Sequence, residues 1–269
     1  MNPLSDAHLH TTFCDGEHTP AQMAEAAAER GMHSLGICCH SPFPFPCEWT
    51  VGDREEAFKA EIAGLKEAYR GSLSISLGCE LDSYSPLPRG YDYLISSVHC
   101  LMREGVLFPV DESAADFMTM LCEGFGGDPD LMGEVYFARV AEAVETCRPQ
   151  MVGHFDLLFK YEDTLGLGLA SRPRILRAAE EAIGRILRVC PRFELNTGAM
   201  HRIGRAEPYP CAALLEQIRR LGGRIILSSD SHQKDSLLYA FPEMTERLRS
   251  MGFETLDLLR DGQFVTEAL

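Results

Sequence analysis

Short apolar runs alternate with longer amphipathic stretches along nearly the whole of this 269-residue chain. The runs predict strands and the stretches predict helices. Regular alternation of this kind is typical of a parallel sheet whose strands are joined by helical crossovers, and a length of about 250 residues is usual for an α/β barrel. Because the sequence has no long linker, repeat or low-complexity tract, we expect one barrel domain over residues 1–269. The expected strands cover residues 7–9, 34–39, 73–79, 91–98, 151–153, 193–195 and 224–228.

Local signals mark where several helices begin. Thr19 followed by Pro20 and Gln22 predicts a capped helix start, which Gly31 then ends. Asp53 is expected to cap the next helix, and Asp128 before a proline to open another. The expected helices cover residues 20–30, 53–70, 111–123, 129–147, 173–189, 210–221 and 235–251.

The charge balance excludes some classes of partner. The chain carries 25 Lys and Arg against 40 Asp and Glu, a net charge of −15. Binding to nucleic acid or to an acidic membrane needs a basic face, so we expect neither, and the oligomeric state is left open. The N-terminus lacks a basic segment followed by an apolar one, and no apolar run of about 18 residues exists, so we expect a cytoplasmic protein. The ten cysteines form no CxxC pair, which predicts reduced thiols rather than a thiolate zinc site.

The histidines fall at the ends of the expected strands. In a parallel barrel these ends share one face, where the active sites of such folds lie. A single histidine at a strand end is usually structural, but six histidines and two acids at one edge predict a metal cluster. Imidazole and carboxylate ligands suit zinc, iron or manganese. The eight residues are His8, His10, His40, Glu80, His99, His154, Asp230 and His232.

These motifs resemble those of the PHP (polymerase and histidinol phosphatase) metallophosphoesterases. The resemblance begins with the segment from His8 to Gly16 and continues through His40-Ser41, Gly78-Cys79-Glu80, Ser97-Val98-His99, Gly153-His154-Phe155-Asp156 and Ser229-Asp230-Ser231-His232. It implies a distorted (β/α)7 TIM-like barrel with three divalent metal ions (zinc, iron or manganese). Carried over by position, His8, His10, Glu80 and Asp230 hold one metal. Glu80 bridges to a second metal bound by His99 and His154, and Asp15, His40 and His232 hold the third.

Two positions depart from the family pattern. Many relatives have a histidine where Asp15 stands, and His18 is a rival ligand close by; we favour Asp15, because His18 adjoins the helix cap. His201 stands where a small residue is expected, and we interpret it as loop variation rather than as a ligand.

The segment 194–210 resembles the histidinol-phosphatase branch of the family. This branch implies hydrolysis of L-histidinol phosphate, with a water shared between metals as the nucleophile. Arg202 and then Arg205 are our candidates for contacting the phosphate, because a guanidinium suits bidentate contact with it. Asp156 is a candidate for orienting an imidazole, and Lys160 for a further phosphate contact. Phe43, Phe45 and Trp49 are candidates for stacking on the substrate or covering the barrel mouth.

Three other functions compete with this one. A related phosphoesterase could act on a nucleotide or another phosphate ester with the same metals. A nuclease or polymerase-associated module is disfavoured by the net charge of −15. A non-enzymatic metal-binding protein is disfavoured because every expected ligand type is present.

Overall fold

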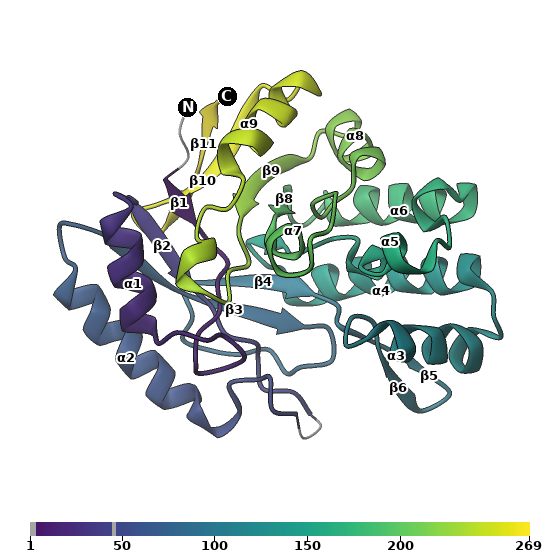
Figure 1. The fold of residues 1–269 in the computed structure, drawn as a ribbon, viewed down its shortest axis with the longest axis horizontal. Coiled ribbons are helices and arrows are strands. Elements are labelled where there is room, and N and C mark those ends of the chain that lie inside the picture. Colours follow the sequence, from purple (N-terminus) through teal and green to yellow (C-terminus); the bar gives the residue numbers. More distant parts are fainter. Residues whose placement is uncertain (1–3, 45–46) are drawn as a thin grey trace.

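A curled sheet of nine strands forms the centre of the molecule, with the helices outside it (Figure 1). The computed structural model describes residues 4–44 and 47–269. Seven parallel strands stand in chain order around the barrel, and they confirm the distorted TIM-like fold. Six lie where the alternating pattern predicts, but the first lies at Ser5–Asp6 rather than at residues 7–9, where Leu9 forms only an isolated bridge. These strands are β1 (Ser5–Asp6), β2 (Ser34–Ile37), β3 (Ser74–Asp82), β4 (Tyr93–Ser97), β7 (Met151–Val152), β8 (Arg192–Asn196) and β9 (Arg224–Ser228).

The barrel closes between β1 and β9. Beyond β1 and β9, Leu9 bridges to Ser231, and the backbone N–H of His10 donates to the carbonyl of Ser231 at 2.8 Å. This closure brings the chain segments around His8 and Asp230 side by side at the carboxyl ends of the strands. Strand ends far apart in sequence therefore meet at one mouth.

Two hairpins were not predicted. At the C-terminus, β10 (Thr255–Arg260) joins β9 in parallel and pairs antiparallel with β11 (Gln263–Ala268). The strand β10 also contacts β1, so the hairpin covers the seam of the barrel beside β1 (Figure 1). A second hairpin, β5 (Cys100–Arg103) with β6 (Val106–Pro109), follows β4 and turns at Gly105, whose φ is +82°.

Three helices begin at the predicted residues, which are Pro20, Pro129 and Pro173. Thr19 forms the expected capping box with Gln22, and Asp128 accepts hydrogen bonds from two N–H groups of its helix. The helices are α1 (Pro20–Glu29), α2 (Glu55–Ala68), α3 (Ala114–Thr119), α4 (Pro129–Cys147), α5 (Glu162–Leu165), α6 (Pro173–Ile186), α7 (Gly198–Ile203), α8 (Ala212–Arg220) and α9 (Phe241–Ser250).

Four helix predictions were wrong at their N-terminal ends. The helices expected from residues 111 and 210 begin at Ala114 and Ala212. Asp53 lies in a short 3-10 turn before α2, and the helix begins at Glu55 without a side-chain cap. The last helix begins at Phe241 rather than at 235, because Leu238 and Ala240 take φ values of +60° and +57°. An α-helix cannot pass through residues in this left-handed conformation.

The apolar core has two layers. Inside the barrel, small and medium side chains such as Ala7, Ile95 and Met151 pack together, while larger apolar clusters lie between strands and helices.

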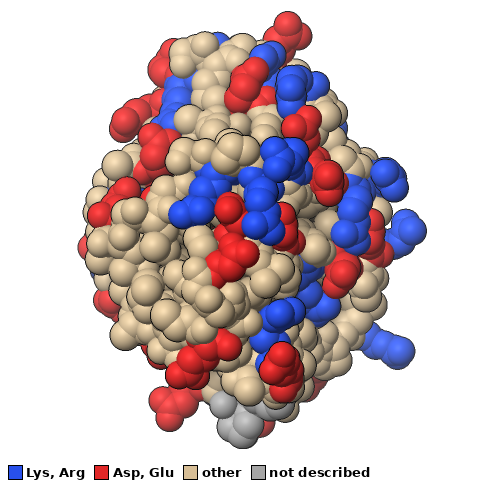
Figure 2. All heavy atoms as spheres, turned by 90° about the vertical axis from the view of Figure 1, so that its right-hand side faces the viewer, with Lys and Arg blue, Asp and Glu red and all other residues tan. Residues whose placement is uncertain are grey.

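On the face that Figure 2 shows, basic and acidic side chains are intermixed. Ion pairs such as Arg174–Glu134 (2.8 Å) and Arg185–Glu145 (2.6 Å) join α6 to α4. None of the helices in the described part of the chain is long and apolar enough to cross a membrane.

Candidate metal centre

The nine predicted metal ligands all meet at the carboxyl ends of the barrel strands. They form three groups of donor atoms around a pocket of about 430 Å³. Each group contains both imidazole nitrogen and carboxylate oxygen, the donor set that suits zinc, iron or manganese.

The first group joins the two ends of the barrel sheet. The Nε2 atoms of His8 and His10 lie 3.1 Å apart, and each lies 3.3 Å from the same oxygen of Glu80. The Oδ1 atom of Asp230 lies 3.3 Å from His10 Nε2 and 3.8 Å from His8 Nε2. Because these donor atoms converge from three strand ends, one ion could contact all of them.

The second group shares the carboxylate of Glu80. Its other oxygen lies 2.8 Å from His154 Nε2 and 3.3 Å from His99 Nε2. The Glu80 side chain is 1% exposed, so its two oxygens have fixed neighbours on both sides. A carboxylate in this arrangement can bridge two metal ions, as the resemblance implied.

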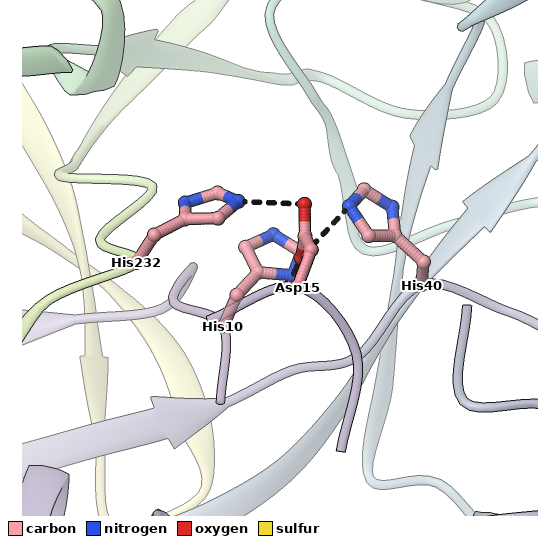
Figure 3. Close-up of side chains that lie close together, drawn as sticks. All are labelled: His10, Asp15, His40 and His232. Carbon is pink, nitrogen blue, oxygen red and sulfur yellow. Dashed lines mark hydrogen bonds and ion pairs between the residues drawn. The ribbon is translucent and has the colours of Figure 1, made fainter. Parts of the chain in front are cut away.

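Asp15 is the centre of the third group (Figure 3). Its two carboxylate oxygens point toward different histidines: Oδ2 lies 3.1 Å from His232 Nε2, and Oδ1 lies 3.6 Å from His40 Nε2 and 3.5 Å from His10 Nδ1. The rival His18 is in none of the three groups. The geometry therefore supports Asp15 over His18 as a candidate ligand in this group.

Opposite charges hold the centre together. Burial would raise the pKa of Glu80, but His40, His8 and His99 together hold that pKa well below its usual range. Burial would lower the pKa of His40, but Glu80 and Asp15 raise it to about 9. The surrounding positive charge thus favours the anionic form of Glu80.

Several buried donor atoms lack a hydrogen-bond partner among the described residues. They are one oxygen of Glu80 and the Nδ1 atoms of His40, His99 and His154. Glu80 faces the Nε2 atoms of His99 and His154, so their Nδ1 atoms lie on the other side of each ring from the donor group. The Glu80 oxygen and His40 Nδ1 lie 2.9 Å apart inside the centre. Because buried polar atoms are normally satisfied, this unsatisfied pair fits a site that binds cations. The chain thus carries donor clusters suited to more than one divalent ion.

Three buried carboxylates lie directly behind the histidines, and sequence reasoning missed them. Asp6 accepts a hydrogen bond from the His8 N–H, and burial raises the pKa of Asp6 to about 6. Asp82 accepts from the His99 N–H at 3.0 Å, and Glu194 lies 2.6 Å from His8 Nδ1. Two of them could have been found from strand periodicity, since Asp6 and Asp82 stand two residues from a ligand and face the same way.

Among the other predicted residues, Arg202, Lys160 and Trp49 line the pocket. The guanidinium of Arg202 lies 3.0 Å from His232 Nε2 and 3.5 Å from Asp230. The ammonium of Lys160 is bonded to Asp111, 2.9 Å from its carboxylate. Trp49 packs its ring edge against His40, with ring centres 4.9 Å apart.

Four other residues discussed in the sequence analysis stand behind or beside the pocket. Arg205 is buried, with its guanidinium 4.2 Å from the ring of Tyr209. Asp156 accepts from the Cys211 N–H at 2.9 Å, and no described contact joins it to an imidazole. Phe43 packs against Trp49, with ring centres 5.5 Å apart. His201 lies in α7 rather than in a loop and packs against Tyr239, and it is in none of the donor groups. Phe45 lies outside the described residues.

The fold and this centre define a metal-binding α/β barrel protein whose donor residues stand at the carboxyl ends of parallel strands. Residues 6–198, which are well over half of the chain, match the PHP domain family. The chain belongs to the PHP domain family, as the resemblance of its motifs predicts.

Curated proteins resemble the chain over nearly its whole length. A protein of Deinococcus radiodurans named "Probable histidinol-phosphatase" is 27% identical in sequence, and the match covers 95% of this chain and 96% of that protein. A histidinol-phosphatase of Bacillus subtilis is 25% identical and covers 90% of this chain and 98% of its own.

Two solved structures share the fold. One is a histidinol phosphate phosphatase from Lactococcus lactis, solved with zinc, L-histidinol and phosphate. It has a TM-score of 0.67 at 20% identity and covers 98% of this chain and 99% of its own. The other, from Listeria monocytogenes, carries a provisional assignment as a histidinol phosphatase. It has a TM-score of 0.76 at 19% identity and covers 89% of this chain and 99% of its own.

Proposed function

We propose that this protein is a metal-dependent histidinol-phosphatase that hydrolyses L-histidinol phosphate to L-histidinol and phosphate in histidine biosynthesis. The observation that carries the proposal is the pocket of about 430 Å³, in which Arg202 adjoins the three donor groups. The names of the full-length relatives support the choice of substrate.

The proposed ligands divide into three sets, with Glu80 shared by two of them. Bound divalent ions supply a water molecule of lowered pKa and offset the negative charge of a phosphate. We propose the sets His8, His10, Glu80 and Asp230; Glu80, His99 and His154; and Asp15, His40 and His232.

Arg202 is the proposed phosphate-binding side chain. Its guanidinium is held between Asp230 and His232, so it stands at the edge of the donor groups with a fixed orientation. A planar guanidinium can donate two parallel hydrogen bonds to phosphate oxygens. Such donors stabilise the transition state, in which negative charge spreads over the oxygens of the transferred phosphoryl group. Since Arg205 packs on Tyr209 instead, we retain Arg202 alone of the two arginines. Trp49, beside His40, would exclude water from the pocket.

The charges of the pocket favour a substrate that is positive away from its phosphate. Glu48, Asp111 and Glu112 line the same pocket as Arg202, and Lys160 offsets only Asp111 among them. L-Histidinol phosphate carries an amino group and an imidazole, which carboxylates attract. A nucleotide offers no such amine at neutral pH, so these carboxylates disfavour the alternative substrate class.

A substrate panel tests this choice. We expect L-histidinol phosphate to be hydrolysed with the highest kcat/KM when it is compared with AMP and with a sugar phosphate, using the manganese-loaded and zinc-loaded protein. If one of the other esters were turned over at least about tenfold more efficiently, a difference of about 1.4 kcal/mol in transition-state stabilisation, the substrate assignment would be wrong.

We also propose that the protein forms a single domain. We further propose that it acts in a reducing compartment such as the cytoplasm. All ten cysteines are free thiols in the structure. Free thiols throughout a chain are usual where glutathione and thioredoxin keep cysteines reduced.

A further inference from the structure

A fully buried carboxylate, Glu194, lies inside the barrel behind the metal centre. It is on β8, where Phe193 and Leu195 join the apolar core shared with the helices. Because side chains alternate along a strand, Glu194 faces the barrel interior. Its side chain is 0% exposed, and it does not line the pocket, so it is not placed to touch a substrate.

Each oxygen of Glu194 serves a different proposed ligand. Oε1 lies 2.6 Å from Nδ1 of His8, and Oε2 accepts the backbone N–H of His154 at 2.7 Å. Two further donors complete the arrangement: the Ser228 hydroxyl donates to Oε1 and the Asn196 amide to Oε2 at 3.1 Å. The carboxylate therefore has partners on both sides and little freedom to move.

We infer that Glu194 is a positioning residue that holds His8 and His154 where their Nε2 atoms can bind metal, an inference that rests on the proposed metal centre. A carboxylate that accepts from Nδ1–H fixes the imidazole tautomer and leaves Nε2 free as a metal donor. The Nε2 atom of His8 is the one that faces His10 and Glu80. Glu194 thus acts through His8 on the first donor group and through the His154 backbone on the second.

The same network reaches a third ligand. The Asn196 amide that donates to Glu194 also donates to Asp230 at 3.2 Å. Three of the proposed ligands, contributed by strand ends from both halves of the chain, are therefore tied to one buried carboxylate. This arrangement explains why a charged group is kept in the dry interior, where it would otherwise be unfavourable.

The surroundings leave little room for adjustment. A Cβ added at Gly153 would lie 2.5 Å from Ser97 Oγ and 3.6 Å from Glu194 Oε2. A Glu194→Gln substitution keeps the volume but leaves only one acceptor atom. The glutamine can accept from the His8 ring or from the His154 N–H, but not from both through separate oxygens.

Metal affinity, measured without substrate, tests the inference. Metal-stripped wild type and Glu194→Gln are titrated with Zn²⁺ and Mn²⁺ in competition with a chromophoric chelator, and the Co²⁺-loaded forms are compared by visible absorption. We expect Glu194→Gln to weaken metal binding by about 10–100-fold and to change the Co²⁺ spectrum. Because no substrate is present, the result is independent of whether L-histidinol phosphate is the substrate.

Asp257→Asn is the matched control. The side chain of Asp257 is also 0% exposed, and its carboxylate accepts a hydrogen bond of 2.6 Å from Arg192. Arg192 is on β8, the strand of Glu194, but Asp257 contacts none of the proposed ligands. Its loss should lower the unfolding temperature and leave metal affinity within twofold of wild type. If Glu194→Gln behaves like this control, the inference is wrong and Glu194 only stabilises the fold.

A second variant covers the case in which Glu194→Gln does not fold. Ser228→Ala removes one hydrogen bond to Glu194 and touches no proposed ligand directly. We expect it to weaken Zn²⁺ binding several-fold and to shift the Co²⁺ spectrum in the same direction. An unchanged affinity and spectrum in this variant would equally contradict the positioning role.

Discussion

His99 shows how one side chain contributes to the centre at the scale of a residue. Its ring lies between two carboxylates, with Nε2 3.3 Å from Glu80 and Nδ1 3.4 Å from Asp82. Glu80 faces Nε2, the nitrogen that we propose binds metal, and Asp82 stands behind the other nitrogen. The ring thus has a carboxylate on each side.

Replacing His99 with alanine should remove a proposed ligand of the second group. We expect the activity of the metal-loaded protein to fall at least about 100-fold, the upper range for perturbing a metal site, and its metal content by about one ion. Elemental analysis and phosphate release measure the two effects. His33→Ala, an exposed histidine outside the donor groups, is the control and should match wild type. An active His99→Ala protein would refute the ligand assignment.

Arg202 permits a separate prediction about the phosphate. Arg202→Met should lower kcat/KM by about 100–1,000-fold, the range for removing one donor to developing charge. Metal content should stay unchanged, because the proposed ligands remain. Steady-state kinetics with elemental analysis would check both, and kcat/KM within threefold of wild type would exclude a phosphate contact.

At the scale of elements, the segments at the carboxyl ends of the strands carry the proposed ligands, while the helices cover the barrel (Figure 1). The ion pair between Lys160 and Asp111 joins two of these segments, the turn after β7 and the connection between β6 and α3. Burial would raise the pKa of Asp111, but Lys160 and His99 hold it below its usual value.

Removing Lys160 should therefore destabilise the protein in a pH-dependent way. A depressed pKa means that Asp111 stabilises the fold above pH 4, and that this stability is lost as the pH falls through the lower folded-state value. In Lys160→Met, burial dominates, the pKa rises, and the charged form becomes unfavourable at neutral pH. We expect a loss of about 1–3 kcal/mol at pH 7 and a smaller loss near pH 4. Urea unfolding at both pH values measures this, and an equal loss at both would contradict the account.

The strand and helix order could be predicted from sequence because alternation is a local signal. Six of the seven parallel strands and the caps at Thr19 and Asp128 follow from such signals. The hairpin β10–β11 could not be predicted in this way, because its place is set by the barrel seam that it covers. The late start of the final helix, at Phe241, reflects the left-handed backbone at Leu238 and Ala240, which no glycine signals in the sequence.

The donor residues of the site could be predicted from the sequence, but the side chains around them could not. Ligand types at strand ends share a face whatever the details of packing, so the donor residues were predicted together and lie together. Arg205 and Asp156 were expected from their place in motifs, yet their neighbours Tyr209 and Cys211 hold them behind the pocket. Motif position alone does not say which way a loop side chain turns. Glu194 was missed because its role depends on contacts with distant strands.

At the scale of the whole molecule, metal binding should stabilise the barrel, because the donor groups join strand ends from both halves of the chain. An ion present at about 1,000 times its dissociation constant adds about 4 kcal/mol, which corresponds to an unfolding temperature about 10 °C higher for a chain of this size. Calorimetry of the metal-stripped and metal-loaded forms should show one transition in each. Two separate transitions would contradict the single domain, and an unchanged temperature would contradict metal binding in the fold.

The central claim is metal-dependent hydrolysis of L-histidinol phosphate at this centre. The most direct measurement is inorganic phosphate released from L-histidinol phosphate by metal-stripped protein before and after addition of Mn²⁺ or Zn²⁺. We predict negligible release before addition and kcat/KM of about 10⁴ M⁻¹s⁻¹ or more afterwards. Silence in a sample shown to contain bound metal would contradict the assigned substrate, and full activity in the metal-stripped protein would contradict the mechanism.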